Sequence, residues 1–386
     1  MQSLEMFCGA GGLALGLHQA GFRPTALLEM NKFSCWTIKD NISRGFFGLE
    51  ERNVIQADVR DINYADFGSK VQFISGGPTF QPFSLGGQHK AQADARDMFP
   101  EAVRAVREIR PLGFIFENVK GLLRASFRSY FNYIILQLSY PEVTINQNNS
   151  WVDHLKALEK RQANGANDSL EYRVTFHLVN AVDYGAPQKR QRVIIVGFRR
   201  DLDVNWEFPP PTHSEDSLNY AKYGDGSYWE ERRIPQRQRP PKKPFVKAMA
   251  ISLPRWRTVR DALADLPDPR TKEAKLFYNH EYRAGAKPYP GHLGSVLDEP
   301  SKTIKAGVHG VPGGENTLIL DDGSIRYYTV RESARIQTFP DNYFFQGSWT
   351  ESMRQIGNAV PVNLATAIGR SVAGQLNRAV KLHLLD

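Results

Sequence analysis

The segment Ser3-Leu-Glu-Met-Phe-Cys-Gly-Ala-Gly-Gly12 joins a short apolar run to a glycine-rich turn, and the helix-period stretch Leu13 to Ala20 follows directly. A short apolar run favours a buried strand. Glycines let the backbone approach a ligand, and the N-terminus of a helix favours an anionic group. The segment therefore predicts a strand, turn and helix at a ligand site, a pattern that several nucleotide-binding folds share.

Further apolar runs follow along the first 200 residues. Val71 to Ser75, Phe114 to Phe116 and Val193 to Phe198 are predicted strands, and Glu101 to Ile109 is a predicted helix between two of them. Strands that alternate with helices are typical of a mostly parallel sheet. Residues 1–200 are therefore predicted to form an α/β domain.

Two acidic residues follow predicted strands in the way expected of ligand-binding groups. Glu29 comes after the apolar run Thr25 to Leu28, and Asp58 after Val54 to Ala57. A carboxylate at the end of the second strand can bind both ribose hydroxyls, and a group after the third can meet an adenine. Each acid alone would suit a helix cap equally well. With the glycine-rich turn, Glu29 and Asp58 make three strand-end features in order, and together they favour a nucleoside cofactor.

The composition changes after Arg200. Residues 201–257 are rich in proline, aromatic and charged residues, and Arg232 to Lys247 is strongly basic and interrupted by prolines. This segment is predicted to be a loop or arm that either contacts DNA phosphates or forms a solvated linker. Residues 258–340 are predicted to be compact, turn-rich and partly β. Residues 350–381 are predicted to form a final helix that begins after a Gly357-Asn358 turn.

The overall composition limits the class of protein. The formal net charge of +8 favours a polyanionic partner, although a basic enzyme without such a partner would also fit. Cys8 and Cys35 are the only cysteines and no Cys-x-x-Cys is present, so we expect neither a disulfide framework nor a metal site. No apolar run reaches the length of a membrane span. We expect a monomer in a reducing cytoplasm.

Five blocks along the chain indicate a family. In order, they are Gly76-Gly-Pro-Thr-Phe-Gln-Pro-Phe-Ser84, Glu117-Asn-Val119, Pro187-Gln-Lys-Arg-Gln-Arg192, Arg331-Glu-Ser-Ala-Arg-Ile-Gln-Thr-Phe-Pro340 and Gln355-Ile-Gly-Asn-Ala-Val-Pro361. They resemble, in order and approximate spacing, the blocks of bacterial-type DNA cytosine-5 methyltransferases, including their Gly-Gly-Pro-Pro-Cys-Gln-Pro-Phe-Ser, Glu-Asn-Val and Gln-x-Arg-x-Arg sequences. The resemblance extends from Leu4 to about Ala373.

The resemblance implies a doubly wound, Rossmann-like methyltransferase domain formed by residues 1–200 and 350–386. It also implies a smaller, irregular, partly β target-recognition domain at residues 201–349. The implied cofactor is S-adenosyl-L-methionine, with S-adenosyl-L-homocysteine as product. The implied partner is double-stranded DNA, from which the target cytosine is swung out because its C5 and C6 cannot be reached within the stack. The resemblance also implies a cognate restriction endonuclease as a partner and a location in the cytoplasm of a prokaryotic cell.

The resemblance also assigns roles to residues. Glu117 should hold N3 and the amino group of the cytosine, Arg192 should bind its O2 side and orient Glu117, and Arg190 should contact backbone phosphate or brace the loop. The residues expected to contact the cofactor are Phe7, Gly9, Ala10, Gly12, Glu29, Met30, Asp58, Val59, Pro78, Met98, Asn358 and Ala359. The residues expected to contact DNA are Gln81, Ser84, Arg232, Arg233, Arg237, Arg239, Lys242 and Lys243.

The chain departs from the family pattern at the nucleophile. Phe80 stands where the family has the cysteine whose thiolate adds to cytosine C6, and Thr79 replaces the preceding proline. A phenyl ring has no lone pair to add to C6. Cys8 and Cys35 are interpreted as a turn residue and a core residue, not as substitutes. The sequence therefore predicts a catalytically dead chain, either a mutated copy of an active enzyme or a natural protein that binds DNA and cofactor without catalysis. Methylation of RNA is a weaker alternative.

Overall fold

A computed structural model describes residues 1–80, 96–144, 150–165, 169–241, 252–287, 294–306 and 316–383. The chain divides into two compact units, which are described separately. Unit 1 comprises Met1–Val179, Gln191–Phe208 and Ala365–Asp386, and unit 2 comprises Asn180–Arg190 and Pro209–Leu364. This division groups residues that contact one another. The predicted boundaries at residues 200 and 350 instead separate a catalytic domain from a target-recognition domain, and they stay a prediction.

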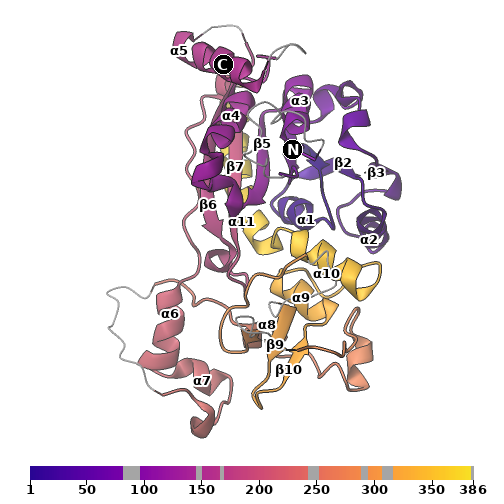
Figure 1. Cartoon of the computed structure of the whole chain (residues 1–386), viewed down its shortest axis with the longest axis vertical. Helices are drawn as coiled ribbons and strands as arrows, with labels where there is room; N and C mark the ends of the chain where they lie inside the picture. Colours follow the sequence, from indigo (N-terminus) through magenta and orange to yellow (C-terminus); the bar gives the residue numbers. More distant parts are fainter. Residues whose placement is uncertain are drawn as a thin grey trace. The chain divides into compact units, whose positions relative to one another are not determined.

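Unit 1 contains a seven-stranded sheet in the order β3-β2-β1-β4-β5-β7-β6 (Figure 1). The neighbouring strands from β3 to β5 pair in parallel, and β7 runs antiparallel to β5. The strands are β1 (Gln2–Met6), β2 (Arg23–Glu29), β3 (Val54–Gln56), β4 (Phe73–Gly76), β5 (Gly113–Val119), β6 (Tyr172–Asn180) and β7 (Gln191–Arg199).

Helices accompany these strands in the predicted alternation. They are α1 (Gly12–Gln19), α2 (Lys32–Ser43), α3 (Phe99–Ile109), α4 (Arg128–Ser139), α5 (Trp151–Asn164) and α11 (Val362–His383). The mostly parallel, Rossmann-like α/β fold predicted from the sequence is therefore confirmed.

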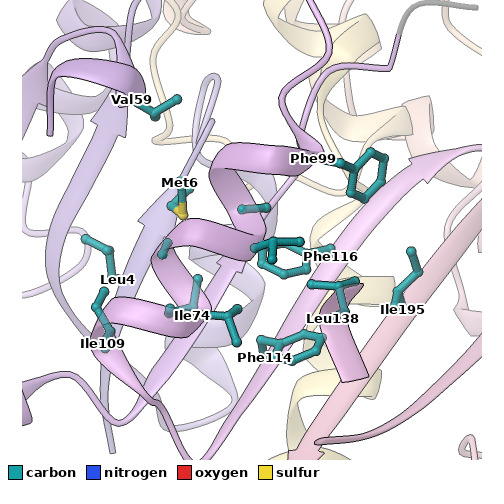
Figure 2. Packing of buried hydrophobic residues seen from close by; sticks show 14 of the residues in the cluster. Leu4, Met6, Val59, Ile74, Phe99, Ile109, Phe114, Phe116, Leu138 and Ile195 are labelled. Atoms are coloured by element: carbon teal, nitrogen blue, oxygen red, sulfur yellow. The ribbon is translucent and has the colours of Figure 1, made fainter. Parts of the chain in front are cut away.

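The core of unit 1 explains why the sheet forms where it does. Leu4 and Met6 alternate along β1 and pack with Ile74 of β4 and with side chains of α3 and α4, such as Phe99 and Leu138 (Figure 2). Because side chains alternate across a strand, Ser3 and Glu5 face the opposite side of the sheet.

Helix α11 lies against α1 within unit 1. A Cβ on Gly369 of α11 would lie 2.7 Å from the side chain of Leu17 and 2.9 Å from that of Ala20, so the two helices need glycine there.

Unit 2 contains short helices and a three-stranded sheet in the order β10-β9-β8. Its elements are α6 (Glu215–Asn219), a π-helix (Tyr220–Gly224), α7 (Ser227–Glu231), α8 (Val259–Leu263), β8 (Ser295–Val296), β9 (Thr317–Ile319), β10 (Ile325–Tyr327), α9 (Val330–Ile336) and α10 (Trp349–Asn358). The predicted final helix is wrong in one respect. Gly357 and Asn358 are the last residues of α10, and α11 begins separately after Pro361.

Candidate functional site

The turn after β1 has the backbone that a close-lying ligand requires. Phe7 has φ 51°, and Gly9 and Gly11 have φ 53° and 83°. A bulky residue at positive φ is a strained conformation that concentrates at ligand sites. Gly11 is the N-cap of α1, and the first turn of that helix carries no acidic residue. The turn therefore offers a glycine-rich backbone that a ligand can approach closely, next to the N-terminus of α1.

Glu29 ends β2 beside this turn. One carboxylate oxygen, Oε2, accepts a hydrogen bond from the backbone N–H of Gly9 at 2.8 Å, and Oε1 accepts one from Asn31 at 2.8 Å. Each carboxylate oxygen has further acceptor capacity. The carboxylate is thus held in one orientation while it can still accept from a pair of ligand hydroxyls.

The other residues expected at the cofactor lie in neighbouring loops of the same sheet edge. Asp58 caps a short 3₁₀-helix through the N–H of Arg60 and also pairs with the Arg60 guanidinium at 2.5 Å. These bonds from Arg60 hold the pKa of Asp58 below its usual range. Met30 is 67% exposed, which leaves its side chain available to a ligand, whereas Val59 is buried.

The fold gathers these groups because β1, β2, β3 and β4 are parallel neighbours. Their carboxyl ends precede Phe7, Met30, Asp58 and Pro78 respectively, and such ends line one edge of a sheet, where ligands of α/β proteins bind. A glycine turn, a fixed carboxylate and a helix N-terminus at that edge fit a nucleoside cofactor. Ala10, Gly12 and Met98 belong to unit 1 as well, whereas Asn358 and Ala359 belong to unit 2.

The segment that leads to Phe80 is fixed by two hydrogen bonds to backbone carbonyls. Asn118 Nδ2 donates to the carbonyl of Pro78 at 2.8 Å, and the N–H of Met98 donates to the carbonyl of Thr79 at 3.0 Å. Asn118 is buried, so its loss would leave a desolvated carbonyl. No role was predicted for Asn118 from the sequence, although it lies in the Glu-Asn-Val block. The signal in the sequence that could have identified Asn118 is its position directly after Glu117.

The ring of Phe80 packs into an aromatic cluster that we call the Phe80 cluster, formed by Phe80, Phe127 and Tyr130. Its centroid lies 5.3 Å from that of Phe127 in an edge-on arrangement and 5.8 Å from that of Tyr130 in a stacked one. These contacts place the ring beside Tyr130 of α4 and beside Phe127, which precedes that helix. The family resemblance predicts that the ring faces the space meant for the flipped cytosine, flanked by Glu117 and Arg192, and this stays a prediction.

Glu117 and Arg192 are brought together by the antiparallel pairing of β5 and β7. Glu117 pairs with Ile194, which puts Arg192 diagonally opposite on the same face. Arg192 Nε lies 2.7 Å from Glu117 Oε1, and the two side chains are 13% and 10% exposed. Oε1 is buried, and within the described residues it accepts no hydrogen bond of normal geometry. The carboxylate is thus charge-balanced but retains acceptor capacity.

The segment preceding Phe80 also passes Glu117. A Cβ built on Gly77 would lie 3.5 Å from Glu117 Oε2, an ordinary contact distance. The predicted catalytic groups Glu117, Arg192 and the position-80 segment therefore lie in one region of unit 1.

Neither cysteine is an accessible thiolate. Burial, together with the nearby charge of Glu29, raises the pKa of Cys8 well above its ordinary value, and the same causes raise the pKa of Cys35 to about 12. The Cys35 thiol donates to the carbonyl of Glu29 at 3.3 Å. Both thiols are thus held neutral beside the turn after β1, which agrees with their interpretation as structural residues.

Arg190 belongs to unit 2 and is fully buried. Its guanidinium donates to the carbonyls of Ile304 at 3.1 Å and Gly357 at 2.6 Å. Of the two roles left open by the sequence, bracing fits this environment better than a phosphate contact. Its buried neighbours Gln188 and Gln337 were not predicted as site residues, although both lie in blocks of the family pattern.

Two arginines in the described part of the basic segment are engaged within unit 2. Arg232 pairs with Asp261, and Arg239 donates to the carbonyl of Ile234 at 2.8 Å. Arg233 and Arg237 are exposed. Gln81, Ser84, Lys242 and Lys243 lie outside the described residues.

Two kinds of feature are absent from the described ranges. In these ranges no group of three or more His, Cys, Asp or Glu side chains is placed to hold a metal ion. No helix within them combines the length and apolar character needed to cross a membrane. The expected absence of a metal stays a prediction.

Comparison with known proteins agrees with the fold and with the family resemblance. The chain is 33% identical over 383 residues to the type II methyltransferase M.PspPI of Psychrobacter sp., covering 98% of this chain and 80% of that protein. It is 32% identical to the type II methyltransferase M.Eco47II of Escherichia coli, covering 99% and 79%. The solved structure of S. pombe Dnmt2 methyltransferase has the same fold, with a TM-score of 0.56 at 14% identity and 98% of each chain covered.

The family model described as C-5 cytosine-specific DNA methylase matches residues 1–141 and 152–374. A match over nearly the whole chain shows that this protein belongs to the C-5 cytosine-specific DNA methylase family.

Proposed function

We propose that this chain binds double-stranded DNA and S-adenosylmethionine and receives a cytosine swung out of the duplex beside Glu117. The observation that carries the proposal is the Glu117–Arg192 pair, because a buried, charge-balanced carboxylate with remaining acceptor capacity suits the N–H donors of a base edge. The Gly77 to Phe80 segment beside it is where the family places its nucleophile.

The residues act on the base as follows. Glu117 accepts from the amino group of cytosine and holds the proton at N3, which makes C6 more electrophilic. Arg192 donates to the O2 side of the base and orients Glu117 through their ion pair. When bound, S-adenosylmethionine supplies an electrophilic methyl group, and Glu29 holds its ribose hydroxyls.

We further propose that the chain, with Phe80, forms no covalent adduct with DNA. Its ring cannot donate an electron pair to C6, and the raised pKa values of both cysteines argue against a substitute thiolate. Losing a covalent nucleophile commonly costs on the order of 10⁴ to 10⁶ in rate. The chain is then a mutated copy of a methylase whose active form carries cysteine at position 80.

A second candidate function is a natural DNA- and cofactor-binding protein without catalysis. The packing of Phe80 on Phe127 and Tyr130 favours it, because a ring accommodated in an aromatic cluster is compatible with a long-established residue. Under either function we propose a monomer in a prokaryotic cytoplasm. A cognate restriction endonuclease accompanies the first function.

Transfer of tritiated methyl groups to DNA tests the proposal. We expect no incorporation with this chain and clear incorporation with Phe80→Cys, whereas Phe80→Leu, the matched control, stays inactive. Bisulfite sequencing of plasmid DNA from cells expressing Phe80→Cys then gives the target site. Incorporation by the Phe80 chain would contradict the proposal. Activity of Phe80→Cys on tRNA but not on DNA would replace it with the RNA alternative.

A further inference from the structure

The turn that carries Asn358 is held from inside unit 2 by Gln337. Its side-chain amide Nε2 donates to the carbonyl of Ile356 at 2.6 Å and to that of Ala359 at 3.0 Å. The backbone carbonyl of Gln337 also accepts from the N–H of Val362 at the start of α11. One buried residue thus fixes the chain before, at and after the join between α10 and α11.

Arg190 and Gln188 complete this network. Arg190 donates to the carbonyl of Gly357, so three of the four carbonyls from residues 356 to 359 are held by two side chains. Gln188 Nε2 donates to Gln337 Oε1 at 2.9 Å, and Gln188 Oε1 accepts from the N–H of Ile304 at 2.8 Å.

The same network brings a second segment against the turn. A Cβ on Gly357 would lie 2.4 Å from the backbone nitrogen of Ala306 and 2.5 Å from the carbonyl carbon of Lys305. Only glycine permits this approach. Asn316 holds the segment from another direction, since it accepts from the N–H of Lys305 at 3.0 Å and donates to its carbonyl at 2.9 Å.

The supporting residues are buried, whereas the residue that they support is exposed. Gln188, Arg190 and Gln337 are each 0% exposed. Asn358 is exposed, although Gly357 and Ala359 on either side are buried. Each donor removed from a buried polar network leaves a desolvated carbonyl, so the network resists displacement of the turn. Such a frame keeps one exposed side chain in a defined position.

We propose that Gln188, Arg190 and Gln337 are positioning residues that fix the turn at residues 356–359 so that Asn358 can hold the cofactor. This inference rests on the proposed function for S-adenosylmethionine as the cofactor, and on the family resemblance for Asn358 as one of its contacts. Under this proposal Arg190 supports binding of the cofactor and does not contact DNA phosphate.

The test compares two arginines of unit 2 that are equally buried and differ in what they hold. Arg190→Met removes the donor to the Gly357 carbonyl of the turn. Arg331→Met is the matched control, because Arg331 is also 0% exposed and donates to carbonyls away from the turn, those of Tyr278, Pro340 and Tyr343. Each full-length variant is measured by urea unfolding, by calorimetry with S-adenosylhomocysteine and by hydrogen exchange.

We expect both variants to lose stability, but only Arg190→Met to lose affinity for S-adenosylhomocysteine, by about tenfold for the loss of a positioned hydrogen bond. Exchange at the amides of residues 357–360 should also rise in that variant alone. Arg190→Lys, which can reach one carbonyl but not both, should fall in between. Equal affinities for the two methionine variants would overturn the proposal, since a merely structural arginine predicts that result.

Gln337→Glu keeps the inference testable if Arg190→Met does not fold, because it removes both donors to the turn with little change of shape. We expect the same loss of affinity, and unchanged binding would reject the network. Failure of the unaltered chain to bind S-adenosylhomocysteine at millimolar concentration is a different result, which contradicts the proposed function itself.

Discussion

The ring of Phe80 stacks on that of Tyr130, with centroids 5.8 Å apart and planes inclined by 23°. The Tyr130 hydroxyl donates to Asp97, whose other carboxylate oxygen accepts from the N–H of Phe99 at the start of α3. Tyr130 thus contacts residue 80 and the residues just before α3. Position 80, where the family has its catalytic cysteine, carries in this chain an aromatic side chain that packs on its neighbours.

Replacing Phe80 by cysteine should therefore lower the stability of the protein while it restores the nucleophile. Phe80→Cys removes a partly buried ring from the Phe80 cluster, and we expect a loss of about 1–2 kcal/mol in the free energy of unfolding. Phe80→Leu keeps more apolar volume and should lose less. Urea denaturation of the three proteins measures this order. A Phe80→Cys protein as stable as the starting chain would show that the cluster contributes little.

With S-adenosylmethionine present, the same variant should trap DNA that contains 5-fluorocytosine at the target site. Once the thiolate has added to C6 and the methyl group has been transferred to C5, the fluorine on C5 cannot be removed as the proton would be, and the thiolate cannot leave. We expect a denaturant-resistant complex with Phe80→Cys and none with Phe80. If Phe80→Cys gives no complex, the double change Thr79→Pro with Phe80→Cys tests whether Thr79 misplaces the segment. A complex with the unaltered chain would point to Cys8 or Cys35.

The Glu117–Arg192 pair should behave as a buried ion pair. Arg192→Met leaves a buried carboxylate without its counter-charge, and we expect a loss of about 3–5 kcal/mol. Glu117→Met with Arg192→Met removes both charges and should be markedly more stable than the single variant. A double-mutant cycle by denaturation measures the difference. If the effects of the two replacements on the free energy of unfolding were additive, the two side chains would not interact as a buried ion pair. In the Phe80→Cys background, Glu117→Gln should lower kcat by about 10² to 10⁴.

The fold was predictable because it depends on local pattern. Short apolar runs predicted β1, β4, β5 and β7 to within a few residues. Glu29 at the end of β2 and Asp58 after β3 are the acids by which the sequence predicts a ligand edge. The exception was the join at Gly357. Helix-period residues continue on both sides of it, so one helix was expected where Ala359 to Pro361 separate two.

The site was predictable only where it depends on residue type. The family blocks named Glu117 and Arg192, but the packing of Phe80 depends on Phe127 and Tyr130, more than 40 positions away. The hydrogen bond from Gln188 to Gln337 spans 149 positions. Such partners follow from the tertiary fold, which periodicity does not give.

Glu29 and Asp58 should contribute unequally to cofactor binding. Glu29→Gln loses the charge that two ribose hydroxyls would meet, so we expect binding of S-adenosylhomocysteine to weaken by at least about tenfold. Asp58 is already engaged by Arg60, and Asp58→Asn should weaken binding less. Calorimetry on both variants checks the order. A larger effect at Asp58 would show that the carboxylate leaves Arg60 for the ligand.

Salt dependence should distinguish exposed from paired arginines in the basic segment. Replacing the exposed Arg233 and Arg237 by alanine should flatten the dependence of log affinity on log salt by roughly one unit for each phosphate that is no longer neutralised. Arg232→Ala should chiefly reduce stability, because its partner Asp261 also caps α8. Fluorescence anisotropy over a salt series measures the slopes. An unchanged slope in the Arg233→Ala/Arg237→Ala double variant would identify this part of the segment as a linker.

A buried acid in the sheet should make stability depend on pH. Glu5 is 2% exposed and accepts hydrogen bonds from the Ser3 and Ser75 hydroxyls, and burial raises its pKa from 4.5 to about 7. Folding therefore favours the protonated acid. Below about pH 4.5 both states are protonated and burial has no ionisation cost. As the pH rises from 4.5 to 7 the unfolded chain ionises first, so stability falls, and above 7 the cost is constant.

The isosteric variant Glu5→Gln has no charge to bury in either state. Its stability advantage over the unaltered chain should therefore grow from near zero to about 3 kcal/mol between pH 4.5 and 7 and then level off. Urea denaturation at several pH values measures this difference, and Glu159→Gln at an exposed site is the control, for which we expect no such trend. An advantage that stays constant across the window would mean that Glu5 ionises in the folded protein as it does in the unfolded chain, with water or a cation reaching the polar group formed by Ser3, Glu5 and Ser75.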